Sequence, residues 1–181
     1  MKNESCPFRA FSDTPNDCQL AVVDIGYAAQ KKTCGLFWTG APQPVELAFG
    51  DAVRRTAEVI KPLSKPLLVL EAVLSTYHAP SGNPDIRGEF EQGRGWYYGA
   101  GVLTFAAALR FLQVLNDLLQ GRTLWVAEAF LSNKDTATGH GEDALLIHNR
   151  FWNAPTVELR PGVESASPLV QGVPSVRVFA L

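Results

Sequence analysis

Short apolar runs with turn residues between them open the patterned part of the chain. Residues 19–29, 31–40 and 41–50 each have the length and composition of a strand, and their close succession predicts a three-stranded meander. Residues 51–63 then carry apolar side chains at helical spacing, with Asp51 as the expected N-cap. This part of the chain therefore predicts three strands followed by a helix.

In the rest of the chain, strand patterns alternate with helix patterns. Residues 66–75 form one continuous apolar run, which is typical of a strand covered on both faces. An amphipathic helix is expected over 99–121, a second buried strand over 123–132 and a further helix over 139–152. Residues 175–181 have the pattern of an edge strand.

This order of elements predicts an α/β fold, in which a mixed sheet of about five strands is flanked by helices. Right-handed crossovers place the fourth strand beside the first at the centre of the sheet. Residues 1–18 lack periodicity and are expected to form an irregular arm. Residues 19–154 are expected to form one domain, with residues 155–181 as a C-terminal extension that packs on it.

Single acids stand inside the apolar strands. Asp24 lies in "VVDIG" and Glu71 in "LLVLEAVLS", and an isolated buried carboxylate needs a partner, a proton or a metal ion. Two carboxylates on neighbouring strands repel each other unless cations such as Mg²⁺ or Mn²⁺ lie between them. His140 and Asp143, in "HGED", face the same side of one helical turn. Glu128 repeats the buried acid on a later strand, and we expect it to support the ligands rather than to be one.

Each of these residues also has a purely structural interpretation. Asp24 fits a strand-end acid bonded to a turn, and Asp143 fits a first-turn acid that the helix dipole favours. His140 fits an ordinary residue at the start of a helix. His148 is expected at the surface or at the rim of the site. The metal interpretation therefore depends on whether the side chains converge.

The long loop after the fourth strand, residues 76–98, is rich in glycine, arginine and aromatic residues. Ligands of open α/β sheets bind beyond the carboxyl ends of the strands, which is where this loop begins. We therefore take Arg87, Arg94 and His78 as candidate contacts to substrate phosphates. The aromatic residues 96–98 are expected to pack against the start of the next helix.

Composition limits the classes of function. With 181 residues, 46% of them hydrophobic, the chain fits one globular domain, and a net charge of −2 provides no broad attraction for nucleic acid. Nucleic acid would therefore need a local site. Three cysteines without C-x-x-C spacing argue against a disulfide framework and fit a cytoplasmic protein. We expect no membrane segment, and a homodimer is compatible with the sequence.

Strand order and the positions of the acids resemble the ribonuclease-H-like nuclease superfamily. The motifs "VVDIG", "VLEA" and "HGEDALLI" are similar to those of its RuvC-type resolvase branch, and "EDALL" also resembles the ending of a related family of predicted RNase-H-like nucleases. The resemblance spans residues 20–152 and implies an RNase-H-like sheet of five strands. It implies a catalytic and metal-binding set composed of Asp24, Glu71, His140 and Asp143.

The resemblance implies a nuclease that uses Mg²⁺ or Mn²⁺ to hydrolyse phosphodiester bonds by a two-metal mechanism. DNA and RNA both remain open as substrates. The alternative is an RNase-H-like binding or scaffolding domain without catalysis of its own, which the low basic charge and the long aromatic loop favour.

Overall fold

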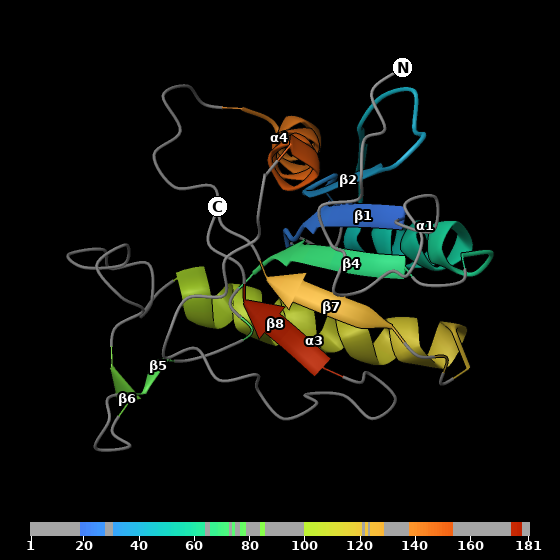
Figure 1. Cartoon of the computed structure of the whole chain (residues 1–181). Coiled ribbons are helices and arrows are strands. Elements are labelled where there is room, and N and C mark those ends of the chain that lie inside the picture. Colours follow the sequence, from blue (N-terminus) through green and yellow to red (C-terminus); the bar gives the residue numbers. More distant parts are fainter. Residues whose placement is uncertain are drawn as a thin grey trace.

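The computed structural model describes residues 19–27, 31–63, 66–72, 74, 77–78, 84–85, 100–120, 122, 124–128, 138–153 and 175–178. The strands of the main sheet are β1 (Gln19–Asp24), β2 (Cys34–Trp38), β3 (Val45–Leu47), β4 (Pro66–Glu71), β7 (Trp125–Glu128) and β8 (Ser175–Val178). They lie in the order β3-β2-β1-β4-β7-β8 (Figure 1). The helices are α1 (Phe49–Ile60), α3 (Ala100–Leu118) and α4 (His140–Asn153). The predicted α/β fold with a mixed sheet is therefore confirmed.

The strand directions follow from the connections. β2 runs antiparallel to both β1 and β3, which it reaches through short segments. β4, β7 and β8 run parallel to one another and to β1. A parallel strand needs a crossover, and α1 precedes β4 while α3 precedes β7. β1 and β4 are therefore neighbours near the centre of the sheet, as predicted.

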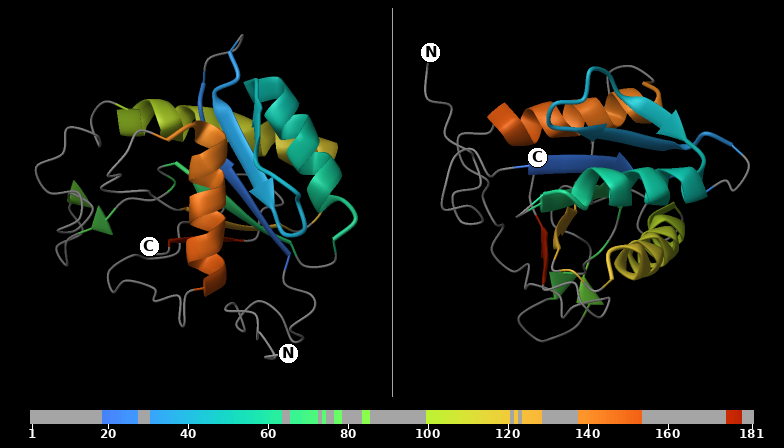
Figure 2. Two further views of the ribbon diagram at one scale, coloured as in Figure 1. Left: turned by 90° about the horizontal axis from the view of Figure 1, so that it is seen from above. Right: turned by 90° about the vertical axis from the view of Figure 1, so that its right-hand side faces the viewer.

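Helices cover both faces of the sheet: α1 and α3 lie on one face and α4 lies on the other (Figure 2). The alternation of side chains along β1 explains this division. Ala21, Val23 and Ile25 belong to the hydrophobic core that α1 and α3 complete. Leu20 and Val22 are equally buried but lie outside that cluster, because they point to the opposite face, where α4 packs on β1 and β2.

The start of α1 differs from the prediction. The helix begins at Phe49 with Ala48 as the N-cap, which makes no side-chain cap hydrogen bond, so Asp51 is not the N-cap. Because β3 ends at Leu47, the chain enters the helix almost directly from the strand, before Asp51 is reached. Asp51 lies instead in the first turn, where an acid is favoured, and pairs with Arg54 at 2.5 Å.

The buried side of α3 also differs in part from the amphipathic pattern. Ala108, Phe111 and Leu115 are fully buried in the core, whereas Val102 is 56% exposed. The helix is apolar on more than one side, so periodicity alone did not identify its buried stripe. The chain leaves the helix through Gln120, a non-glycine residue in the left-handed region with φ 56°.

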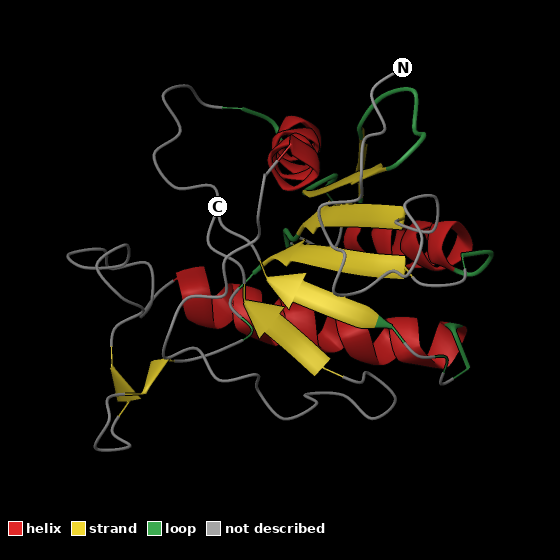
Figure 3. Cartoon of the chain, in the orientation of Figure 1, coloured by secondary structure: helices red, strands yellow, loops and turns green. Residues whose placement is uncertain are grey.

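Two short segments lie beyond this arrangement. β5 (Tyr77–His78) and β6 (Pro84–Asp85) pair with each other in a separate two-stranded sheet within the predicted loop (Figure 3). β8 is the edge strand expected in the C-terminal extension, and it makes the main sheet six-stranded where five strands were expected. The predicted arm, residues 1–18, lies outside the described residues. Among the helices described here, none has the length and apolar character needed to cross a membrane.

Candidate metal centre

Asp24 is the last residue of β1, at the carboxyl end of a central strand. Its neighbours Val23 and Ile25 belong to the core formed with α1 and α3, so Asp24 points to the face that α4 covers. Its partner in register on β4 is Glu71, whose neighbours Leu70 and Ala72 also belong to that core. The two acids therefore lie on adjacent strands and face the same side, which confirms the predicted adjacency.

The register continues across the antiparallel strands and produces one transverse row of residues. Asp24 is paired with Gly35, and Gly35 is paired with Glu46. From β3 to β4 the row therefore reads Glu46, Gly35, Asp24 and Glu71. Neighbouring strands lie about 4.8 Å apart, so the row spans about 14 Å and carries three acids and one glycine.

The first turn of α4 lies directly on the glycine of this row. A Cβ atom built at Gly35 would stand 1.7 Å from the His140 carbonyl oxygen and 2.7 Å from the Gly141 backbone nitrogen. Only a residue without a side chain allows so close an approach of helix and strand. Gly35 thereby places the N-terminus of α4 between the acids on either side of it, Glu46 and Asp24.

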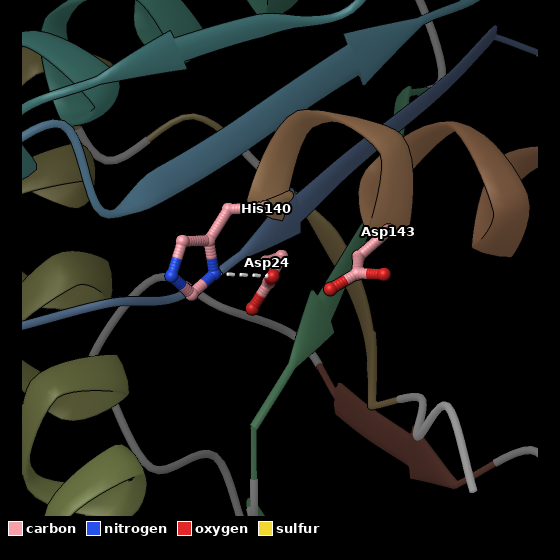
Figure 4. Close-up of side chains that lie close together, drawn as sticks. All are labelled: Asp24, His140 and Asp143. Carbon is pink, nitrogen blue, oxygen red and sulfur yellow. Dashed lines mark hydrogen bonds and ion pairs between the residues drawn. The ribbon is translucent and has the colours of Figure 1, made fainter. Parts of the chain in front are cut away.

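This approach brings His140 into contact with Asp24. Nδ1 of His140 donates a hydrogen bond to Oδ2 of Asp24 at 2.6 Å, and the other ring nitrogen lies on the side away from Asp24 (Figure 4). The Asp24 side chain is 10% exposed and that of His140 is 43% exposed. The hydrogen bond to the carboxylate, and the negative charge of Asp24, Asp143 and Glu46, raise the pKa of His140 above its ordinary value.

Asp143 completes the group from the same helical turn. It is 2% exposed, and its Oδ1 accepts a hydrogen bond from the Thr138 hydroxyl group just before the helix. The negative charge lies in the first turn of α4, where the helix dipole favours an anion. Asp24, His140 and Asp143 each offer one ligand atom, and these atoms all lie within 4.8 Å of one another. Three of the four predicted ligands therefore converge.

The three side chains fit a divalent cation. Two buried carboxylates close to each other are costly unless positive charge is nearby, and carboxylate oxygens are the ligands that Mg²⁺ and Mn²⁺ prefer. An imidazole ligand is tolerated better by Mn²⁺ than by Mg²⁺, so Mn²⁺ is the better probe. The proton on Nδ1 of His140, in its hydrogen bond to Oδ2, stabilises the negative charge of Asp24. A metal ion and this proton therefore compete for the same carboxylate.

Glu71, the fourth predicted ligand, lies outside the compact group. It is half-buried and stands beside Asp24 in the row, but its carboxylate is not among the ligand atoms within 4.8 Å of one another. Glu128, at the end of β7, has its backbone opposite Leu70 rather than Glu71. His78 lies in β5, and Arg87 and Arg94 lie outside the described residues. The roles of Glu71, Glu128 and the three loop residues stay predictions.

His148 is buried, and not at the surface or rim as expected. It follows His140 by two helical turns and lies on the face of α4 that packs on β2, where it is 7% exposed. Its ring lies edge-on to Phe37 with centroids 4.8 Å apart, and its Nε2 lies 3.2 Å from the Thr39 hydroxyl oxygen. Burial lowers the pKa of His148, with a hydrogen bond to Asn149 opposing the shift.

Two residues that shape the site escaped the sequence analysis. Gly35 resembles any glycine near the start of a strand, and nothing local indicates that a helix lies on it. Glu46 alternates with the half-buried Val45 and Leu47, which is the ordinary pattern of an acid on the exposed side of a short strand. The one available signal was Gly139 and Gly141 on either side of His140, since two glycines at a helix start indicate close backbone packing.

The function of this chain has to be inferred from the site itself. The structure supplies a compact Asp–His–Asp group, a row of acids and a helix N-terminus at the carboxyl end of a central strand. Comparison with protein-family models, with curated proteins and with solved structures finds no match.

Proposed function

We propose that this protein is a divalent-metal-dependent nuclease that hydrolyses phosphodiester bonds, with Mg²⁺ or Mn²⁺ held by the Asp–His–Asp group. The observation that carries the proposal is the convergence of Asp24, His140 and Asp143 on one point, with their ligand atoms all within 4.8 Å. His140 and Asp143, at the start of a helix, lie 116 and 119 positions after Asp24 in the sequence, and they meet Asp24 at the end of a strand. A bound cation would stabilise buried acids placed in this way.

A ribonuclease-H-like core is part of the proposal. One support is the strand order β3-β2-β1-β4-β7, in which β2 alone runs opposite to the other four strands. The other support is the place of the acids at the ends of β1 and β4. In the resolvase branch that the motifs resemble, the acids come from the first strand, the fourth strand and the last helix. Asp24, Glu71 and the His140–Asp143 pair occupy these places here.

The roles follow from position and chemistry. A divalent cation supplies positive charge that offsets phosphate charge and activates water for attack on phosphorus. Asp24 would be the ligand common to two cations, and Glu71 on the adjacent strand and Asp143 on α4 would each be a ligand of one of them. His140 acts as a ligand in its neutral form, or holds the attacking water through the ring nitrogen that faces away from Asp24.

Substrate contacts belong to the loop after β4. Arg87, Arg94 and His78 would bind phosphate oxygens, and because the overall charge is −2 these local contacts have to supply the attraction for nucleic acid. Affinity should then fall steeply with salt concentration. The substrate class is nucleic acid, and a panel of single-stranded and double-stranded DNA and RNA identifies the preferred form.

The test is cleavage of this panel with Mn²⁺, with Mg²⁺ and with EDTA. Asp24→Asn keeps the size of the side chain and removes the charge, so it should lose cleavage by at least about 10²-fold while the circular dichroism spectrum stays unchanged. Glu58→Gln, an exposed acid on α1, is the control and should cleave like the wild type. Cleavage in EDTA, or full cleavage by Asp24→Asn, would reject the proposal.

A second candidate is a binding or scaffolding domain with the same core and no catalysis of its own. The observation that favours it is the 2.6 Å hydrogen bond between His140 and Asp24, which already provides a partner for the buried acid. In that case the pair is structural and needs no metal ion. Calorimetry separates the two candidates, since a nuclease of this kind binds Mn²⁺ and a scaffold of this kind releases no heat on titration with Mn²⁺.

A further inference from the structure

Glu46 is an acid at the site to which neither the sequence motifs nor the metal group assigns a role. It lies on β3, at the end of the row opposite Glu71, and is separated from Asp24 by Gly35 on β2. Two strand spacings separate the Cα atoms of Glu46 and Asp24, about 10 Å, so Glu46 lies outside the compact ligand group. Apart from its negative charge, which helps to raise the pKa of His140, Glu46 acts on the metal ligands through its contacts with α4.

The side chain of Glu46 contacts the segment that carries His140. Its Oε1 accepts a hydrogen bond from the backbone N–H of Gly141 at 3.3 Å. A Cβ atom at Gly139 would stand 2.6 Å from the same oxygen, and one at Gly141 would stand 3.3 Å from Cγ of Glu46. Both glycines of the Gly139–His140–Gly141 segment are therefore packed against this one side chain.

Glu46 and Asp24 thus hold the first turn of α4 from two sides. Asp24 accepts a hydrogen bond from the His140 ring, Glu46 accepts one from the Gly141 backbone, and the His140 carbonyl group lies over Gly35 between them. The contact with β3 spans 95 positions of sequence, so it places the helix relative to the sheet. A local cap is also present, since Glu142 accepts a hydrogen bond from the Gly139 N–H at 3.3 Å, but that contact lies within the helix start itself.

We infer that Glu46 is a positioning residue of the metal centre. By anchoring the Gly141 backbone it holds the first turn of α4 in the rotation that directs His140 and Asp143 to Asp24. The inference rests on the proposed function for its consequence, metal binding, and on the described contacts for its structural part. Partners that orient metal ligands without touching the ion commonly change affinity by about 10-fold to 100-fold.

The experiment is Mn²⁺ calorimetry on the full chain with matched variants. Glu46→Ala, which removes the acceptor, should weaken binding by about tenfold, the lower end of the usual range, because Glu46 is exposed. Glu46→Gln keeps an oxygen that accepts from Gly141 and should stay within about threefold of the wild type, as should the control Glu142→Ala. Rescue by glutamine separates positioning from a general effect of charge. Equal affinity of Glu46→Ala and wild type, or equal losses in Glu46→Ala and Glu142→Ala, would overturn the inference.

A second measurement keeps failure of the inference distinct from failure of the proposed function. Hydrogen exchange of the Gly141 amide requires no metal, and it should be at least about tenfold faster in Glu46→Ala than in wild type and in Glu46→Gln, because a protecting hydrogen bond is lost. If the wild type binds no Mn²⁺, the metal proposal fails, and the exchange result alone decides whether Glu46 anchors α4. An unprotected Gly141 amide in the wild type would overturn the anchoring. Should Glu46→Ala not fold, Glu46→Asp, whose shorter side chain withdraws the acceptor, takes its place in both measurements.

Discussion

Substitution of Gly35 by alanine should displace the helix that carries two of the three clustered ligands. The new Cβ would stand 1.7 Å from the His140 carbonyl oxygen and 2.1 Å from its carbonyl carbon. Ordinary contacts of this kind need about 3.5 Å, so strand and helix have to separate by about 1.5 to 2 Å. Both groups in the clash are backbone atoms, so no change of rotamer can relieve it. The first turn of α4 has to move as a unit.

The magnitude follows from this displacement. Overpacking of a close contact costs about 1 to 3 kcal/mol of unfolding free energy. The Nδ1–Oδ2 distance of 2.6 Å between His140 and Asp24 would increase beyond hydrogen-bonding range. His140 and Asp143 move together while Asp24 stays on β1, so Mn²⁺ affinity should fall by at least about tenfold.

Urea unfolding and Mn²⁺ calorimetry measure the two effects. The matched control is Gly50→Ala in α1, where the new Cβ would have only the Arg54 guanidinium nitrogen near it, at 3.7 Å. This control should be neutral or up to about 1 kcal/mol more stable, as is usual for glycine replaced by alanine within a helix. If Gly35→Ala unfolds at the wild-type urea concentration and binds Mn²⁺ with wild-type affinity, the close approach does not organise the site.

Further predictions concern the protonation of the two histidines of α4 and two single residues elsewhere in the fold. The hydrogen bond to Asp24 raises the pKa of His140. The contribution of His140 to the unfolding free energy should therefore be complete below about pH 6.5 and be lost as pH rises through the folded-state pKa. His148 should have the opposite effect: because burial lowers its pKa, the unfolding free energy should fall as pH decreases below about 6.5. Urea unfolding of wild type, His140→Gln and His148→Gln from pH 5 to 9 separates the contributions of the two histidines. Mn²⁺ should bind more weakly below the raised pKa of His140, with proton release detectable by calorimetry in buffers of different ionisation enthalpy. Gln120→Gly should raise the unfolding free energy by about 1 kcal/mol, because the backbone there has φ 56°, and an unchanged urea midpoint would contradict this. Burial raises the pKa of the Cys34 thiol to about 11, so peptide-resolved mass spectrometry should find it unalkylated in the native protein at pH 8 and alkylated in urea.

The elements of the fold were accessible from sequence because hydrophobic periodicity reflects burial directly. The runs at 66–75 and 123–132 predicted strands covered on both faces, and these became β4 and β7. The adjacency of Asp24 and Glu71 also followed, since the crossover rule restricts where a parallel strand can be placed. The buried stripe of α3 did not follow, because a helix with apolar residues on several sides has no single direction that periodicity can identify.

The geometry of the site could be predicted only in part. His140 and Asp143 were recognisable because residues three apart share a helix face, and their acid and imidazole groups suit a metal ion. The contribution of Gly35 depends on strand register, which places it beside Asp24, and on a helix more than a hundred residues away. Glu46 gave no signal for the same reason. Tertiary contacts of this kind are properties of register and docking and leave no periodic mark on the sequence.

We propose that Asp24, His140 and Asp143 together hold a divalent cation. The most direct measurement is anomalous diffraction from crystals soaked in millimolar Mn²⁺ at neutral pH or above, where His140 gives up its proton more readily. We expect an anomalous peak between the two carboxylates, with oxygen ligands of Asp24 and Asp143 at about 2.1 Å and the His140–Asp24 hydrogen bond broken or rearranged. A difference map with no peak at this position, and with His140 still bonded to Asp24, would contradict it.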